Sequence, residues 1–245
     1  MTHFYDDADF SYDQYWQNRK YEHQSEVTAL VELLQKSKFK HVVDIGGGFG
    51  RLSKILLRYT KNITLVEPSQ KQRNLARKYL GESVEIRPGL SDKTGLPQSC
   101  CDLVVLVRVV HHLPDPSSTL AEIKRILAPK GKLVLEFANS TSFKARIRSF
   151  FSGQPILPIP TERRSSTNIK NQTIPFVNHH PHSIFKLLKR EGFVVKKTLS
   201  VSNFRSPLIK KLTPIAILNY LEKISQKPLS KVSFGPSIFV LAERT

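Results

Sequence analysis

The chain has 245 residues, of which 40% are hydrophobic and 24% are charged. This composition suits one well-packed domain with some elaboration and excludes a disordered or fibrous protein. The sequence has no apolar run near the roughly 18 residues that cross a bilayer. Its acidic, aromatic start, MTHFYDDADFSYD, lacks the pattern of a secretory leader, so we expect a cytoplasmic protein.

The charge is distributed unevenly. Residues 139–245 hold 18 Lys and Arg against 4 Asp and Glu, whereas residues 1–138 hold 20 against 16, within a formal net charge of +18. Such asymmetry indicates an anionic partner, which could be nucleic acid, a membrane surface or a charged substrate. The two cysteines, Cys100 and Cys101, are adjacent, which fits neither a disulfide framework nor a site of spaced metal ligands. We expect reduced thiols.

Helical and strand patterns alternate through the first half of the chain. The apolar spacing predicts a leading helix at 22–35. Strands and helices then alternate: strand 41–45, helix 52–59, strand 62–66, helix 69–80 and strand 84–87. The run DLVVLV at 102–107 predicts a central strand that is covered on both faces. Asp115 and Pro116 predict the N-cap and first position of a helix ending near residue 127, followed by a turn at 129–131 and a strand at 132–137.

Alternation of this kind predicts an α/β fold, doubly wound and Rossmann-like, with a seven-stranded, mostly parallel sheet and helices on both faces. The second half supplies a helix at 181–191 and strands at 193–199 and 237–243. Two insertions, 139–180 and 200–236, separate these elements, and Thr213 and Pro214 predict a short helix through residue 224. We expect a single domain over 1–245, with a cap at 1–38, a cofactor-binding half at 39–138 and a substrate-facing half at 139–245.

A glycine-rich turn follows the first strand. The stretch VVDIGGGFGRL, residues 42–52, contains Asp44, Gly46, Gly48 and Gly50, where a backbone without Cβ atoms can approach a ligand closely. The residue three after Gly48 is Arg51, so the dinucleotide spacing G-x-G-x-x-G is not met, and Lys-Ser/Thr of a P-loop is absent. Glu67 ends the second strand, where a carboxylate can accept hydrogen bonds from ribose hydroxyls.

Two further features complete the pattern. Asp92 lies beyond the third strand and is followed by Leu96 and Pro97, and RVVHHLPDP, residues 108–116, ends the fourth strand. With these motifs, residues 40–138 resemble the class I S-adenosylmethionine-dependent methyltransferases, most closely the group called methyltransferase type 11. The resemblance implies that Asp44, Gly46, Gly48 and Gly50 hold the methionine portion of S-adenosyl-L-methionine, Glu67 its ribose, and Asp92 its adenine amino group. The family's Gly-Asp-Ala is here Gly-Leu-Ser-Asp, which shifts the acid relative to its glycine.

Several other side chains are candidates for the site. His111 and His112 stand where a general base for the acceptor could act, with a turn-stabilising pair as the alternative. The aromatic segment containing Tyr12, Tyr15 and Trp16 could close over the cofactor, as in similar methyltransferases, with Arg19 available to its carboxylate; the alternative is surface packing. We predict no metal at His179, His180 and His182, because Pro181 interrupts them and no carboxylate cluster accompanies them.

We therefore expect methyl transfer to a small or lipid-like acceptor, anionic or associated with a membrane, since basic and apolar residues alternate in both insertions. Peripheral contact with the inner membrane surface would follow. One alternative is an RNA or DNA methyltransferase, which the charge favours but the absence of an Asn/Asp-Pro-Pro-Tyr motif opposes. Another is a non-catalytic protein that binds the cofactor or a partner.

Overall fold

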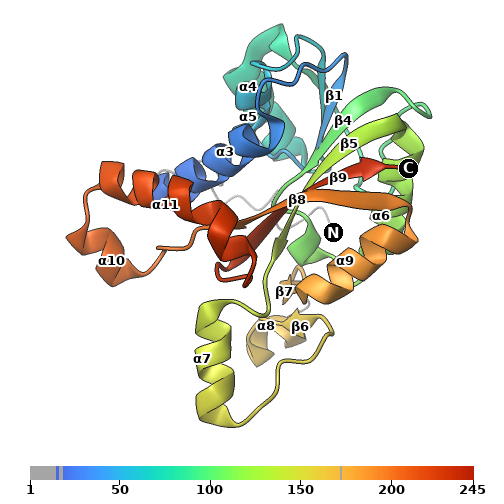
Figure 1. Ribbon diagram of the computed structural model, residues 1–245. Coiled ribbons are helices and arrows are strands. Elements are labelled where there is room, and N and C mark those ends of the chain that lie inside the picture. Colours follow the sequence, from blue (N-terminus) through green and yellow to red (C-terminus); the bar gives the residue numbers. More distant parts are fainter. Residues whose placement is uncertain (1–14, 17–18, 172) are drawn as a thin grey trace.

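The computed structural model describes residues 15–16, 19–171 and 173–245, and it is built around one seven-stranded sheet (Figure 1). The strand order is β3-β2-β1-β4-β5-β9-β8, in which β9 runs antiparallel to both of its neighbours. The strands are β1 (Val42–Ile45), β2 (Ile63–Val66), β3 (Glu85–Arg87), β4 (Cys101–Leu106), β5 (Leu127–Ala138), β8 (Phe193–Val201) and β9 (Ser237–Arg244). The predicted fold class is confirmed.

The strands β1, β2 and β4 are mostly apolar and are buried on both of their faces. All four residues of β1 and of β2 are buried, and β4 is buried except at Asp102. The strand β1 pairs in parallel with β2 on one side and β4 on the other. Continuous apolar strands of this kind are stable only where helices cover both faces.

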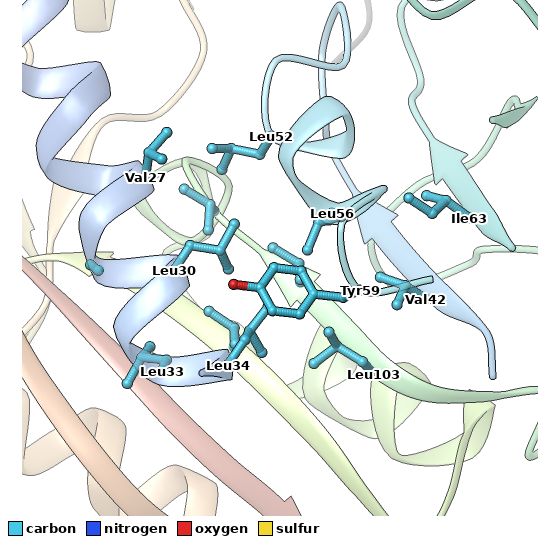
Figure 2. Close-up of a cluster of buried hydrophobic side chains, with 14 of the residues drawn as sticks. Val27, Leu30, Leu33, Leu34, Val42, Leu52, Leu56, Tyr59, Ile63 and Leu103 are labelled. Atoms are coloured by element: carbon cyan, nitrogen blue, oxygen red, sulfur yellow. The ribbon is translucent and has the colours of Figure 1, made fainter. Parts of the chain in front are cut away.

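One face is covered by α3 (Lys20–Leu34), α4 (Ser53–Leu56) and α5 (Gln70–Leu80). Figure 2 shows Val27, Leu30 and Leu34 of α3 meeting Leu52, Leu56 and Tyr59 above the strand residues Val42, Ile63 and Leu103. The predicted leading helix is thus part of the main core.

The other face is covered by α6 (Ser117–Ile126) and α9 (Pro181–Arg190). Leu120, Ile123 and Ile126 of α6 and Ile184 and Leu188 of α9 are buried against the strands. Helices on both faces of a parallel sheet make the fold doubly wound, and such folds bind ligands at the carboxyl ends of their strands.

Three local predictions need correction. The helix expected over 52–59 is regular only in α4, because residues 57–59 continue as turns. Pro116 is the N-cap of α6 rather than its first residue, and Asp115 accepts a hydrogen bond from the Ser117 amide. The expected turn at 129–131 lies within β5 as a bulge: Cys101 pairs with Leu127 and Leu103 with Lys132, so three extra residues loop out of the ladder.

Both insertions contain more regular structure than the sequence predicts. The first holds α7 (Phe143–Ser152), α8 (Ser166–Lys170) and a small sheet of β6 (Thr161–Glu162) and β7 (Val177–Asn178). The second holds α10 (Pro207–Leu212) and α11 (Ile215–Ser230), so the helix expected to end at residue 224 continues for six more residues.

The insertions follow β5 and β8, which point the same way, and they therefore extend from the carboxyl edge of the sheet (Figure 1). In the described part of the chain, none of the helices combines the length and the apolar character needed to span a bilayer.

Candidate functional site

The turn from β1 to α4 brings three glycines into left-handed backbone conformation: Gly46, Gly48 and Gly50 have φ of +68°, +58° and +88°. A Cβ on Gly46 would lie 2.4 Å from Cγ2 of Val109, which follows β4. The turn is therefore packed directly against the end of β4, and only glycine gives both the conformation and the close approach.

Glu67 directly follows β2, and its side chain faces this turn. Its carboxylate accepts hydrogen bonds from the amides of Gly48 at 3.0 Å and Ser69 at 2.9 Å, and the side chain is buried. Burial raises the pKa of Glu67 to about 7, against the two amides and Arg73, which lower it, while Asp44 adds a small upward contribution. Each carboxylate oxygen retains a lone pair, so the group can still accept from a diol.

Asp44 lies one strand away, inside β1, and its carboxylate accepts a hydrogen bond from the Ser53 hydroxyl at 2.6 Å. Burial raises its pKa to about 6. A Cβ on Gly47 would meet this carboxylate at 2.7 Å, so Asp44 supports the glycine turn from below. Two buried carboxylates with raised pKa values at one strand edge are typical of a functional site.

Glu26 of α3 joins the cap helix to the site, a connection that the sequence reasoning missed. Its buried carboxylate binds both Arg51, which follows the glycine turn, and Arg108, which follows β4, the latter at 2.8 Å. Both guanidinium groups also stand against the Trp16 ring, at 3.6 Å for Arg51 and 5.1 Å for Arg108. Trp16 is buried in this packing, and a closing role for the aromatic segment stays a prediction.

The electrostatics of this cluster are balanced by Glu26. Burial opposes its ionisation, but the charges of Arg108 and Arg51 outweigh that cost and lower its pKa. The signal in the sequence was the pair Glu22 and Glu26, four residues apart, on the helix face that also carries Leu30 and Leu33. Acids on an apolar face indicate a buried polar network.

A second group of cations lies beside this cluster. Arg19 stacks over the Tyr15 ring at 4.1 Å, and Arg205, which begins the second insertion, interacts electrostatically with both Arg19 and Arg108. Partial loss of hydration beside neighbouring atoms lowers the pKa of Arg205, and the charge of Arg108 lowers it further. The residue as a whole is still exposed to solvent. Positive charge is therefore concentrated at this edge. Tyr12 lies outside the described residues.

Asp92 is placed in the exposed turn between Leu90 and Lys93, whose backbones pair with each other. The turn is anchored at its side by Ser91, which contacts the Thr119 hydroxyl at 2.9 Å. Leu90 and Ser91, which separate Asp92 from Gly89, are part of this turn, and an adenine contact by Asp92 stays a prediction.

The two histidines after β4 have different surroundings. His112 donates from Nδ1 to the Pro175 carbonyl at 2.8 Å, which ties the turn to the first insertion. His111 is buried between His112, at a ring distance of 4.0 Å, and Phe176, at 4.8 Å. Burial and the neighbouring charges lower the pKa of His111 well below its usual value, so the imidazole is neutral. The geometry supports the turn-stabilising alternative for His112 and leaves His111 as the candidate base.

The remaining histidines and cysteines have structural surroundings. His179 contacts the Val110 carbonyl through Nε2 at 3.1 Å, and His180 caps α9. Cys101 is buried, and this burial raises its thiol pKa. Across residues 15–16, 19–171 and 173–245, three or more side chains of the metal-binding types do not come together.

The chain was compared with known proteins, and residues 43–135 match the model of a methyltransferase domain. It is 27% identical over 124 residues to a ubiquinone biosynthesis O-methyltransferase of Aromatoleum aromaticum, covering 49% of this chain and 53% of that protein. It is 35% identical over 107 residues to an uncharacterized methyltransferase of Geobacillus sp., covering 43% of this chain and 49% of that protein. The chain thus spans about half the length of the curated relatives it matches.

Among solved structures, the fold is similar to an S-adenosylmethionine-dependent methyltransferase of Thermotoga maritima. The TM-score is 0.65 at 20% identity, over 96% of this chain and 95% of that one. The glycine turn and Glu67 lie at the carboxyl edge of the sheet of this shared fold.

Proposed function

We propose that this chain is a class I S-adenosylmethionine-dependent methyltransferase that transfers a methyl group to a small or lipid-like acceptor. The match of residues 43–135 to a methyltransferase domain and the similarity of the fold support this proposal. Glu67 carries this proposal. It is a buried carboxylate that follows β2 and faces a glycine-rich turn, which is the arrangement that a ribose diol requires.

The site residues fit the cofactor in three ways. Gly46, Gly48 and Gly50 let a ligand approach the backbone of the turn closely, Glu67 can accept from both ribose hydroxyls, and Arg19 can meet the amino acid carboxylate. S-adenosylmethionine supplies a methyl group on a positively charged sulfur. The chain then has to align the acceptor and exclude water. The buried Trp16 ring, packed against Arg51 and Arg108, closes the site on the side of α3.

His111 is the proposed proton acceptor if the acceptor atom must be deprotonated. Its imidazole is neutral, and its ring makes no hydrogen bond to the other residues that the structure describes. Because its lowered pKa makes the ring a weak base, His111 would accept the proton only as methyl transfer makes that proton acidic. Its role is separable from that of His112, whose Nδ1 proton is already donated to Pro175.

We further propose that the acceptor carries a negative charge. Arg19, Arg108 and Arg205 gather at the carboxyl edge of the sheet, with Glu22 and Glu26 as the acids that act on them. A carboxylate or phosphate on the acceptor would complement this surplus. The ubiquinone biosynthesis O-methyltransferase that the chain resembles favours a small acceptor over a macromolecule.

Calorimetric titration with S-adenosylmethionine tests the cofactor assignment. Glu67→Ala should weaken binding at least tenfold, because each charge-assisted hydrogen bond contributes about 1.5 to 3 kcal/mol. Glu85→Ala is the matched control, since this carboxylate lies on the neighbouring strand but is exposed and paired with Arg87. Equal affinities of the Glu67 and Glu85 variants would reject the assignment.

The acceptor is found by incubating the protein with methyl-labelled S-adenosylmethionine and fractionated cell extract, followed by mass spectrometry. Label in a small molecule or lipid supports the proposal. Label in RNA or DNA would favour the nucleic acid alternative, although Cys101 is buried with a raised pKa and is a poor nucleophile for methylating a base carbon. Cofactor binding without transfer to any fraction would indicate a non-catalytic protein.

A further inference from the structure

The helix α11 turns polar side chains toward the protein and apolar side chains toward solvent, the opposite of a helix that packs on a core. The face turned toward the protein carries Leu218, Glu222 and Gln226, four residues apart and all buried. Glu222 accepts hydrogen bonds from the Tyr21 hydroxyl at 2.6 Å and the Ser202 amide at 2.7 Å. The inward face is thus held mainly by polar contacts.

The outward face of the same helix is apolar. Ile217, Tyr220 and Ile224 follow one another at spacings of three and four residues, and they are 50%, 65% and 53% exposed. A helix on the surface of a water-soluble protein normally places such a stripe toward the core. In α10, Leu208 and Leu212 extend the exposed apolar surface.

The helix α7 repeats this arrangement. It has no buried residue, and Phe150 and Phe151, both 83% exposed, lie on the same side as Phe143 and Ile147. Its first turn is tied to the end of the second insertion, because the Phe143 ring stacks on Phe234 at 4.8 Å and its amide donates to the Phe234 carbonyl. In Figure 1, α7 and the pair α10–α11 project beyond the carboxyl edge of the sheet.

The charge around these apolar side chains is of one sign. The three helices carry seven basic residues and a single acid, Glu222, which is buried. Lys210 is engaged by Glu22 at 2.8 Å, but Lys211, Lys223 and Lys227 are exposed. Helices that expose apolar side chains and lysines, without an exposed acid, complement an anionic lipid surface. The cores of protein interfaces, in contrast, are depleted in lysine.

We propose that α7, α10 and α11 dock this protein on an anionic lipid bilayer. The apolar side chains of α11 and α7 enter the boundary between headgroups and acyl chains, and the exposed lysines contact the anionic headgroups. Tyr220 suits this depth because an aromatic ring with a polar end partitions to the interface. The docking helices lie on the sheet edge that carries Glu67, so docking would bring that edge close to lipid-borne molecules.

Flotation with phosphatidylcholine vesicles, with and without phosphatidylglycerol, tests the proposal on the full chain. No methyl donor is added, so the result is independent of the proposed enzymatic function. We expect binding only to vesicles that contain phosphatidylglycerol, and loss of that binding as salt is raised. Absence of binding to these vesicles at low salt would overturn the proposal.

Two sets of variants separate the apolar from the electrostatic contribution. The triple change Ile217→Ser, Tyr220→Ser and Ile224→Ser should weaken partitioning at least about tenfold, since these side chains lose their burial in lipid. Changing Lys211, Lys223 and Lys227 to Gln should weaken it on the order of a hundredfold, at about fivefold per lysine. Val194→Ser, an exposed apolar residue on β8, is the matched control and should bind as the unchanged protein does.

The lysine variant touches no buried group, so its folding is secure, and circular dichroism verifies the apolar variant. Vesicle binding that survives both sets of changes would overturn the proposal. A dimer in sedimentation that the apolar variant dissociates, without vesicle binding by the unchanged protein, would also overturn it and assign this face to self-association.

Discussion

Glu67 shows how one buried carboxyl group can link ligand binding to pH. In the folded protein its pKa is raised to about 7 from 4.5, chiefly by burial. The folded chain therefore binds more protons than the unfolded chain between these values, and this group's contribution to stability falls as pH rises through that window.

Ligand binding should respond in the opposite direction. Only the ionised carboxylate accepts hydrogen bonds from both ribose hydroxyls, so we expect the affinity for S-adenosylmethionine to rise as pH increases through about 7 and then to level off. Calorimetry at a series of pH values measures this. Glu67→Gln, which cannot ionise, should bind more weakly and lack this rise, and equal slopes in the two proteins would contradict the prediction.

Glu26 illustrates the cost of removing one member of a buried ionic cluster. Its carboxylate compensates Arg51 and Arg108, which lie between α3, the glycine turn and the end of β4. Glu26→Gln should lower the free energy of unfolding by about 3 to 5 kcal/mol, because two guanidinium groups lose their counter-charge.

Urea unfolding provides the measurement, with Glu32→Gln as the matched control. Glu32 is on the same helix and pairs with Lys197 at 2.5 Å, but it is half exposed, so its removal should cost less than about 1 kcal/mol. Because the pKa of Glu26 is lowered, its contribution is present above the unfolded value and is lost as pH falls below about 4.5. A cost for Glu26→Gln no larger than for Glu32→Gln would mean that the cluster is not stabilising.

At the scale of elements, the glycine turn combines two constraints that can be separated by substitution. Gly46 and Gly153 have nearly the same φ, +68° and +66°, but only Gly46 has a neighbour where a Cβ would stand, at 2.4 Å. Gly153→Ala should therefore cost about 1 to 2 kcal/mol from backbone strain alone.

Gly46→Ala should cost more than Gly153→Ala and should also weaken S-adenosylmethionine binding, because Val109 and the turn must move apart. Thermal unfolding and calorimetry on both variants measure the difference. The same cost in both proteins, with unchanged affinity for Gly46→Ala, would show that the contact between the turn and β4 adjusts freely.

The helices α3 and α11 are joined through a hydroxyl group. Tyr21 donates to Glu222 at 2.6 Å and accepts from the Phe204 amide at 2.9 Å. Tyr21→Phe leaves that amide without its partner and removes one hydrogen bond from the buried carboxylate, which should cost about 1 to 3 kcal/mol. Amide hydrogen exchange should quicken in α10 and α11 more than in the sheet.

Tyr59→Phe controls for the loss of a hydroxyl. Tyr59 is a buried residue of the core in Figure 2, and its hydroxyl makes no hydrogen bond to the other described residues. Its substitution should change stability by less than about 1 kcal/mol and leave exchange in α10 and α11 unaltered. Equal protection of these helices in both variants would contradict the proposed attachment.

Across the whole molecule, the parallel sheet could be predicted because apolar runs such as 102–107 are unambiguous in period and length. The partners of Glu26 could not, because acids on the apolar face of a helix indicate a buried polar network but do not identify Arg51 and Arg108 as the cations that complete it. Nor could the orientation of α11: the apolar stripe at Ile217, Tyr220 and Ile224 is visible, but periodicity does not say which stripe faces the protein. The three residues looped out of β5 depend on pairing with β4, which no local pattern encodes.

The excess of positive charge gives a prediction for the molecule as a whole. Residues 139–245 hold 18 basic residues and 4 acids, and one of these acids, Glu222, is buried in hydrogen bonds. The other three acids, Glu162, Glu191 and Glu243, each pair with one basic residue. Because the cations of this half outnumber its acids, their mutual repulsion favours the expanded, unfolded chain.

Added salt should consequently stabilise the protein. Raising ionic strength from about 0.01 to 0.1 M shortens the Debye length from about 30 to 10 Å, which screens repulsion between charges on a surface of this size. We expect the free energy of unfolding in urea to increase over this range. The variant with Lys211, Lys223 and Lys227 changed to Gln should be more stable at low salt and should gain less from added salt. A fall in stability with salt would mean that the ion pairs outweigh the repulsion, so that the charge of this half is compensated within the fold.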